Sequence, residues 1–149
     1  MRIAVLNGPN LNLLGVREPE RYGRTSLADV ERRLGEVAKE LGVELECSQH
    51  NGEGQLIDAV HAMRGRIDGA VVNGGAYSHS SLALRDALVG VSVPFVEVHV
   101  TNVYAREEER RHSMLASEAV GVVVGLGTEG YILALRGLVS VLRARGAAE

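Results

Sequence analysis

At 149 residues the chain has the usual size of one folded domain, and we predict a single domain over residues 1–149. Hydrophobic residues make up 46% and charged residues 23%, a balance that excludes an intrinsically disordered chain. The formal net charge is −3 and both signs are spread along the chain, so we expect neither a nucleic acid nor a membrane surface as partner.

The cysteine content fits a reducing compartment, and the first apolar run gives no sign of export. Cys47 is the single cysteine, so no intramolecular disulfide and no thiolate metal cluster can form. The apolar run at 3–6 is far too short for a signal peptide or a membrane span. We therefore expect a cytoplasmic protein.

Short β-branched runs alternate along the chain with longer helical patterns. Strands are predicted at Ile3–Leu6, Val43–Cys47, Ala70–Asn73, Phe95–His99 and Ala119–Val124. A helix is predicted after the first strand, because apolar residues recur there at spacings of three and four. These residues are Leu27, Val30, Leu34, Val37 and Leu41.

The ends of this first helix are marked in the sequence. Ser26 with Asp29 resembles a capping box, and Gly42 supplies the stop. Three more helices are predicted near 55–64, 81–90 and 130–144. Strands that alternate with helices in this way indicate a parallel sheet covered on both faces.

Five strands joined by right-handed crossovers predict a flavodoxin-like α/β fold, a three-layer sandwich with strand order 2-1-3-4-5. In such a sheet, ligands bind beyond the carboxyl ends of the strands, where the order reverses between the first and third strands. The segments that follow the strands are polar, as a site there would require. They are Asn7–Asn10, Asn73–His79 and His99–Asn102.

The connection between the first strand and its helix is unusually long, roughly 18 residues against the usual two to six. Its polar, glycine-punctuated composition favours a lid or binding loop, and a solvated surface excursion is the alternative. Tyr22 lies in this loop among Arg17, Arg21 and Arg24. A guanidinium at about 4 Å supplies roughly 4 kcal/mol at an effective dielectric near 20, against the roughly 2.7 kcal/mol that moves a phenol pKa from 10 to 8. Tyr22 is therefore a candidate base, the alternative being a tyrosine packed on an arginine stem.

The charged segment 106–112 is predicted to form a helical turn or two. Glu107 and Arg111 are spaced i,i+4 as a favourable pair, whereas Arg106 and Arg110 have the same spacing and repel each other. That repulsion is understandable if an anion or an acidic residue lies beside them, and a solvated charged face is the alternative.

Neither a metal nor a nucleotide cofactor is expected. The five histidines form no His-x-x-x-His motif, and Glu97 with His99 on one strand face supplies two ligands at most. His99, at the carboxyl end of a strand, is placed as an acid or a hydrogen-bond donor. Gly125–Gly130 matches G-x-G-x-x-G, but a dinucleotide site needs a further strand and the chain stops at Glu149. We interpret these glycines as a tight turn, which argues against a nucleotide-dependent reductase.

The polar loops together resemble those of the type II 3-dehydroquinate dehydratases. The resemblance rests on Leu6–Gly15, Arg17–Pro19, Tyr22–Gly23, Asn73–Ser81, Leu84–Ala87, Glu97–Asn102, Ala105–Glu108, Arg110–Ser113 and Gly125–Tyr131. These blocks follow in order over nearly the whole chain, and the first alone is quite specific. Among the small departures, Thr101 stands where serine is more usual and Arg21 adds a charge before Tyr22.

The resemblance implies a cofactor-free lyase of the shikimate pathway, assembled as a dodecamer from a tetramer of trimers. Such an enzyme converts 3-dehydroquinate to 3-dehydroshikimate by anti elimination of water through an enolate, with neither metal nor Schiff base. Aromatic amino acid biosynthesis and quinate breakdown are both compatible with it.

The resemblance also implies a role for each site residue. Tyr22 would take the proton at C2, Arg17 would keep Tyr22 ionised, Asn10 would hold a water at the enolate oxygen, and His99 would protonate the departing C1 hydroxyl. The substrate carboxylate would be bound by Asn73, Val100 and Thr101. The ring hydroxyls would be bound by His79, Arg110 and an Asp86 supplied by a neighbouring subunit. Arg106 would give electrostatic support. The alternative is a non-catalytic flavodoxin-like module that binds a small acid, which leaves the candidate base and acid without a task.

Overall fold

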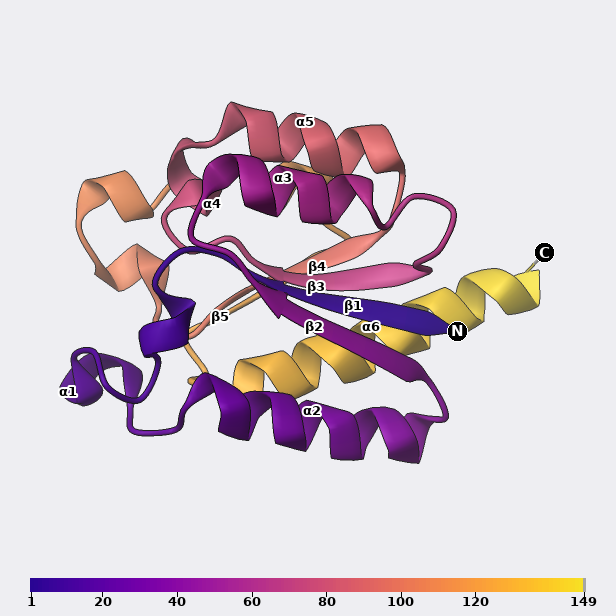
Figure 1. Cartoon of the computed structure of the whole chain (residues 1–149), viewed down its shortest axis with the longest axis horizontal. Coiled ribbons are helices and arrows are strands. Elements are labelled where there is room, and N and C mark those ends of the chain that lie inside the picture. The colour runs from indigo at the N-terminus through magenta and orange to yellow at the C-terminus, as the bar shows by residue number, and fades with distance from the viewer. Residues whose placement is uncertain (149) are drawn as a thin grey trace.

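The computed structural model describes residues 1–148, except for the side chains of Tyr22 and Ala148. Five parallel strands form the middle layer, with α2 and α6 on one face and α3 and α5 on the other (Figure 1). The strands are β1 (Arg2–Asn7), β2 (Glu44–Gln49), β3 (Gly69–Asn73), β4 (Phe95–His99) and β5 (Gly121–Val124). Their order is β2-β1-β3-β4-β5, which confirms the predicted flavodoxin-like sandwich.

The predicted helices are all present, and only the ends of the last three are shifted. They are α2 (Leu27–Leu41), α3 (Glu53–His61), α5 (Leu82–Val91) and α6 (Glu129–Ala148). Shorter helical turns lie in the connections, and of these only the turn within the charged segment 106–112 was predicted. They are α1 (Pro19–Tyr22), α4 (Tyr77–Ser80) and the 3-10 turns η1 (Leu11–Leu13), η2 (Val103–Ala105), η3 (Glu108–Arg110) and η4 (Ala116–Glu118).

The start and stop of α2 follow the sequence signals. Ser26 Oγ accepts a hydrogen bond from the Asp29 N–H at 3.1 Å, and the Asp29 carboxylate accepts one from the Ser26 N–H at 3.1 Å. The Ser26 hydrogen bonds are the main cause that lowers the pKa of Asp29. Gly42 ends the helix in the left-handed region, at φ 69°. The predicted capping box is therefore confirmed.

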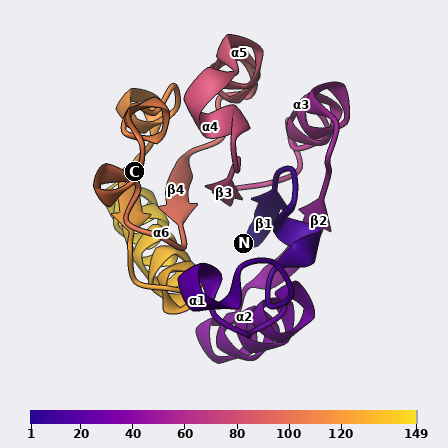
Figure 2. The same cartoon turned by 90° about the vertical axis from the view of Figure 1, so that its left-hand side faces the viewer.

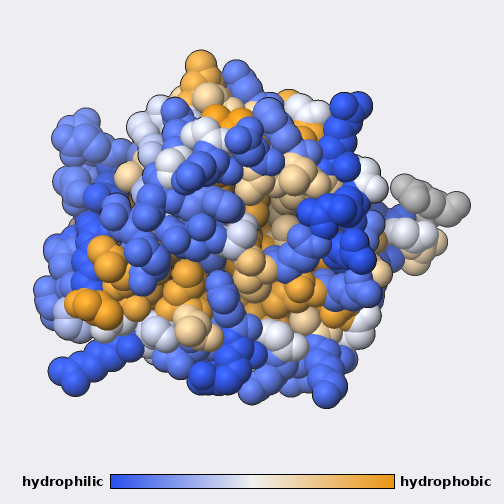
Figure 3. All heavy atoms as spheres, viewed as in Figure 1, coloured by the Kyte–Doolittle hydropathy of each residue, from blue (hydrophilic) through white to orange (hydrophobic). Residues whose placement is uncertain are grey.

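Alternate residues of the central strands enter two separate apolar layers. Ile3 and Val5 pack with the layer of α2 and α6, whereas Ala4 and Leu6 pack with the layer of α3 and α5. Cys47 lies on edge strand β2 against the first layer, where burial raises its pKa to about 12. Apolar atoms show as a band across the middle of the face in Figure 3, between α3 and α2, where β2 runs.

Parallel strands place all their carboxyl ends at one end of the molecule, which faces the viewer in Figure 2. There Asn7 of β1 is the register partner of Asn73 of β3, at the point where the strand order reverses. Among the described residues, no helix is long and apolar enough to cross a membrane.

Candidate active site

A hollow lies beyond the carboxyl ends of β1, β3 and β4, at the predicted position. It is lined by side chains from the three loops that follow these strands. Nine of the predicted site residues line it: Asn10, Arg17, Asn73, His79, His99, Val100, Thr101, Arg106 and Arg110. The apolar lining, which includes Leu11, Leu13 and Val103, was not predicted.

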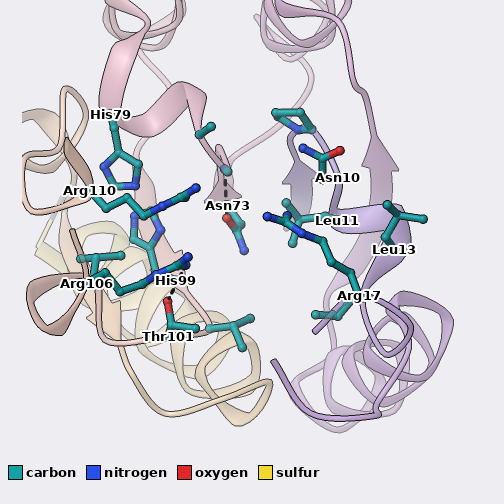
Figure 4. A pocket seen from close by; sticks show the side chains of 16 residues that line it. Asn10, Leu11, Leu13, Arg17, Asn73, His79, His99, Thr101, Arg106 and Arg110 are labelled. Carbon is teal, nitrogen blue, oxygen red and sulfur yellow. Dashed lines mark hydrogen bonds between the residues drawn. The ribbon is translucent and has the colours of Figure 1, made fainter. Parts of the chain in front are cut away.

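Two walls face each other across the hollow (Figure 4). The strand wall follows β3 and β4 and carries His79, His99, Thr101, Arg106 and Arg110. The loop wall follows β1 and carries Asn10, Leu11, Leu13 and Arg17. Asn73 lies between them, at the end of the central strand β3.

The loop wall begins with a close approach of two backbones. The Gly8 N–H donates to the Asn73 carbonyl at 2.8 Å, and a Cβ at Gly8 would lie 2.4 Å from the Gly74 carbonyl oxygen. Only glycine fits there without displacing the β3 loop. Asn10 follows with φ 69°, and its N–H donates to the Asn51 side chain at 3.0 Å. The loop is thus attached to its neighbours as it enters the hollow.

Farther along, the loop wall is more exposed. The Arg17 side chain reaches into the hollow and is 39% exposed, and its Nε lies 3.7 Å from the Glu18 carboxylate. Tyr22 ends the short helix α1, but its side chain lies outside the described part of the structure. Its role as the base remains a prediction.

The strand wall contains a buried acid beside His99. Glu97 lies two residues earlier on the same strand face, and its Oε1 is 3.5 Å from His99 Nε2. The Ser113 hydroxyl donates to the same carboxylate, while the N–H groups of Leu115 and Ala116 donate to Ser113 Oγ at 3.0 and 3.1 Å. Glu97 therefore sits in a fixed position from which it can orient the His99 ring and compensate its positive charge when protonated.

Sequence reasoning missed the contact between Glu97 and Ser113 beside this site. The spacing of Glu97 and His99 was noted only as a weak metal pattern. The same two-residue spacing also places a carboxylate where it can support an imidazole, and this second interpretation could have been made from the sequence. The contribution of Ser113 has no local signal, because 16 positions separate it from Glu97.

His79 stacks on His99, with ring centroids 5.4 Å apart and an interplanar angle of 25°. Its Nδ1 lies 2.8 Å from the carbonyl oxygen of His112, which can only accept, so Nδ1 carries the hydrogen. Burial is the main cause that lowers the pKa of His79, and the nearby His99 and Arg110 act in the same direction. In the resulting neutral ring, Nε2 is left as a hydrogen-bond acceptor.

The charged segment 106–112 forms the predicted helical turn, η3, but not the predicted ion pair. Arg111 donates to the Arg106 carbonyl instead of pairing with Glu107. Glu107 instead pairs with Arg110 Nε at 2.5 Å and lies 3.7 Å from Arg106 Nε. These contacts help to lower the Glu107 pKa to about 2, its own backbone N–H being the largest cause. An acidic residue therefore lies between the two arginines, one of the two explanations given for their spacing.

The turn at Gly125 and Gly127 orients the backbone that follows β4. The Gly125 N–H donates to the His99 carbonyl at 3.2 Å, and the Gly127 N–H donates to the Val100 carbonyl at 3.0 Å. The carbonyls of His99 and Val100 thus both point towards the glycine turn. In a trans peptide the N–H of the next residue points the opposite way, so the N–H groups of Val100 and Thr101 both point away from the turn. Two successive N–H groups on one side form a concavity suited to an anion.

Asp86 lies outside the hollow of its own chain. It is on α5 and lines a separate surface depression between α3 and α5, together with His61 and Arg64. Within residues 1–148, no three histidine, cysteine or acidic side chains come together as a metal site would require.

The fold and site define a flavodoxin-like α/β protein with a cationic hollow at its switch point, which suits a small anionic molecule. The family model of class II dehydroquinases matches residues 1–139, and the chain belongs to this family.

Known relatives agree with this membership. The chain is 59% identical to a 3-dehydroquinate dehydratase of Gemmatimonas aurantiaca, over 95% of this chain and 93% of the relative. It is 56% identical to catabolic 3-dehydroquinase 2 of Aspergillus flavus, over 90% and 89% of the two chains. The crystal structure of a type II dehydroquinase from Butyrivibrio crossotus superimposes with a TM-score of 0.90 at 44% identity, over 93% of this chain and 97% of that one.

Proposed function

We propose that this chain is a 3-dehydroquinate dehydratase that removes water from 3-dehydroquinate to give 3-dehydroshikimate. The observation that carries the proposal is the hollow itself, where side chains from three strand ends converge at the switch point of a class II dehydroquinase fold. The similarity to relatives named as 3-dehydroquinate dehydratases supports the substrate.

Proton removal is assigned to the loop wall. Tyr22, as phenolate, takes the proton at C2 beside the ketone, and the electron pair of the C–H bond moves into the enolate. Arg17 favours the ionised phenol, and Asn10 holds a water at the enolate oxygen. Both Arg17 and Asn10 point into the hollow from this wall, which supports their part. A proton next to a ketone is acidic enough for a positioned base of this kind.

Loss of the hydroxyl is assigned to the strand wall. The enolate reforms the ketone as the C1–O bond breaks, and His99 gives its proton to the departing hydroxyl, which leaves as water. The buried Glu97 carboxylate beside His99 supports this role, because it offsets the positive charge of the protonated ring. Arg17 and His99 lie on opposite walls (Figure 4), as anti elimination requires of the base and acid sides.

The substrate carboxylate is assigned to Asn73 and to the backbone of Val100 and Thr101. The paired N–H groups beside the glycine turn favour this assignment. The ring hydroxyls are assigned to His79, whose Nε2 can accept, and to Arg110, which can donate. Arg106, whose side chain is 10% exposed and which contacts the Thr101 hydroxyl at 3.4 Å, gives electrostatic support.

Asp86 also belongs to the proposed site, but as a residue supplied by a neighbouring subunit. Its position on the outer side of α5, away from the hollow of its own chain, supports that arrangement. We accordingly propose a homo-oligomer, specifically a dodecamer built as a tetramer of trimers. A single domain over 1–149 and a cytoplasmic location complete the proposal.

The test is turnover of 3-dehydroquinate by metal-stripped protein, followed by the ultraviolet absorbance of the conjugated enone product. Activity should survive both chelation and borohydride treatment. Tyr22→Phe should lower kcat by about 10²–10⁴-fold, the range for a positioned base. Tyr104→Phe is the matched control, because Tyr104 is exposed and lies outside the hollow. Absence of turnover in folded, oligomeric wild-type protein would favour the small-acid-binding module instead.

A further inference from the structure

A buried tyrosine lies beneath the hollow and has no part in the chemistry above. Tyr131, near the start of α6, is fully buried. Its hydroxyl donates to Asn7 Oδ1 at 2.6 Å and accepts from Asn73 Nδ2 at 2.9 Å. It therefore joins the ends of β1 and β3 from the α6 side of the sheet. Burial raises the pKa of Tyr131 above its usual value, so the hydroxyl keeps its hydrogen.

The direction of this network follows from a backbone group. The Gly75 N–H, which can only donate, bonds Asn73 Oδ1 at 3.1 Å. The Asn73 amide must then turn its nitrogen towards Tyr131, so the tyrosine oxygen accepts and the tyrosine hydrogen goes to Asn7. If the Asn73 amide were rotated by half a turn, its nitrogen would face the Gly75 N–H, and two donors would meet. All three hydrogen bonds are therefore satisfied by a single orientation of the Asn73 amide.

We propose that Tyr131 is a positioning residue for substrate binding, which acts by holding the Asn73 amide in this orientation. One Asn73 N–H is used by Tyr131, and the second remains for the substrate carboxylate at the floor of the hollow (Figure 4). An Asn73 amide that rotated freely would also present its oxygen, which repels a carboxylate. This inference rests on the proposed function, in which Asn73 binds that carboxylate.

The first variant is Tyr131→Phe, which removes only the hydroxyl. Because the bond to the carboxylate is made in the ground state and the transition state alike, KM for 3-dehydroquinate should rise about tenfold, while kcat changes by less than about threefold. Val139→Ala is the control, since Val139 is buried on the same helix, away from the hollow. It should lower Tm without moving KM. A Tyr131→Phe protein that loses Tm but keeps KM within about twofold would overturn the inference.

A double-mutant cycle tests whether Tyr131 acts through Asn73. Asn73→Ala should raise KM, and adding Tyr131→Phe to it should raise KM no further. A second, multiplicative rise would contradict the inference. If Asn73→Ala raises KM and Tyr131→Phe does not, the inference fails and the proposed function stands. If Asn73→Ala leaves KM unchanged, both the inference and the carboxylate role of Asn73 fail.

A second route covers a Tyr131→Phe protein that does not fold. Asn7→Ala removes the acceptor of the tyrosine hydrogen, so the hydroxyl is free to turn towards Asn73 and compete with the present bond. KM should again rise several-fold with kcat little changed. An unchanged KM in folded Asn7→Ala protein would count against the positioning role.

Discussion

The two walls of the hollow are built in different ways. On the strand wall, His99 ends a buried strand and is 6% exposed, and its neighbour Glu97 is held by Ser113. On the loop wall, Arg17 is partly exposed and the adjacent Val16 is 78% exposed. The sheet thus fixes the proposed acid and most of the proposed binding groups, while a long loop carries the proposed base. The proposed chemistry needs both, because one side must keep its geometry and the other must admit substrate and exclude water.

The largest effect is expected on the strand wall, from His99→Gln. Loss of the proposed acid should lower kcat by about 10²–10⁴-fold, because the hydroxide would leave unprotonated. Steady-state turnover of 3-dehydroquinate measures it, and Tyr104→Phe, at an exposed residue outside the hollow, is again the control. A loss below about tenfold would mean that the fixed wall does not carry the acid.

A smaller effect is expected where the two walls meet, from Gly8→Ala. The new Cβ would lie 2.4 Å from the Gly74 carbonyl oxygen, so one backbone must shift. We expect a loss of about 1–3 kcal/mol in the free energy of unfolding, measured in urea. Gly35→Ala in α2, where a Cβ meets nothing within 4 Å, should instead stabilise the protein by about 0.5–1 kcal/mol. Equal effects of the two changes would show that the junction tolerates displacement.

A pH-dependent effect is expected from His79 on the strand wall. Its pKa lies below the usual 6.5 in the folded protein, chiefly because of burial, so between the two values the unfolded chain binds more protons. Its contribution to stability is fully present above 6.5 and is lost as the pH falls towards the folded pKa. His79→Gln, which keeps a donor for the His112 carbonyl, should reduce this slope in urea unfolding between neutral and mildly acid pH. An identical slope in the two proteins would contradict the assignment.

The smallest effect is expected on the loop wall, from Val16→Ser. Because Val16 is mostly exposed, the free energy of unfolding should change by no more than about 0.5 kcal/mol, and kcat and KM should stay within about twofold. A marked rise in KM would show that this side chain contacts substrate or a neighbouring subunit, and that the loop wall is more ordered than its exposure indicates.

The sequence was sufficient for the sheet and for the position of the hollow at its strand ends. Buried β-branched runs and one strongly capped helix have periodic signals, and parallel strands bring their carboxyl ends together whatever the loops do. The turns α1 and α4 were missed because four residues are too few to show a helical period. The Arg110–Glu107 pair was missed because it depends on a 3-10 turn, which brings residues three positions apart together.

Contacts between distant parts of the chain could not be predicted in this way. Tyr131 meets Asn7 across 124 positions, and the sequence around Gly125–Tyr131 shows only a turn before a helix. What the Tyr131 hydroxyl contacts depends on how α6 lies against β1 and β3. Packing of that kind has no local signature, so a buried polar partner becomes visible only in three dimensions.

The setting of Cys47 makes the chain convenient for labelling. Burial raises the pKa of the Cys47 thiol to about 12, so very little of it is ionised at neutral pH, and alkylating reagents attack the thiolate. A cysteine introduced as Val16→Cys would be exposed and would react first. One fluorophore could then be attached to the loop wall of otherwise unmodified protein, and its emission would report the position of that loop as substrate is added.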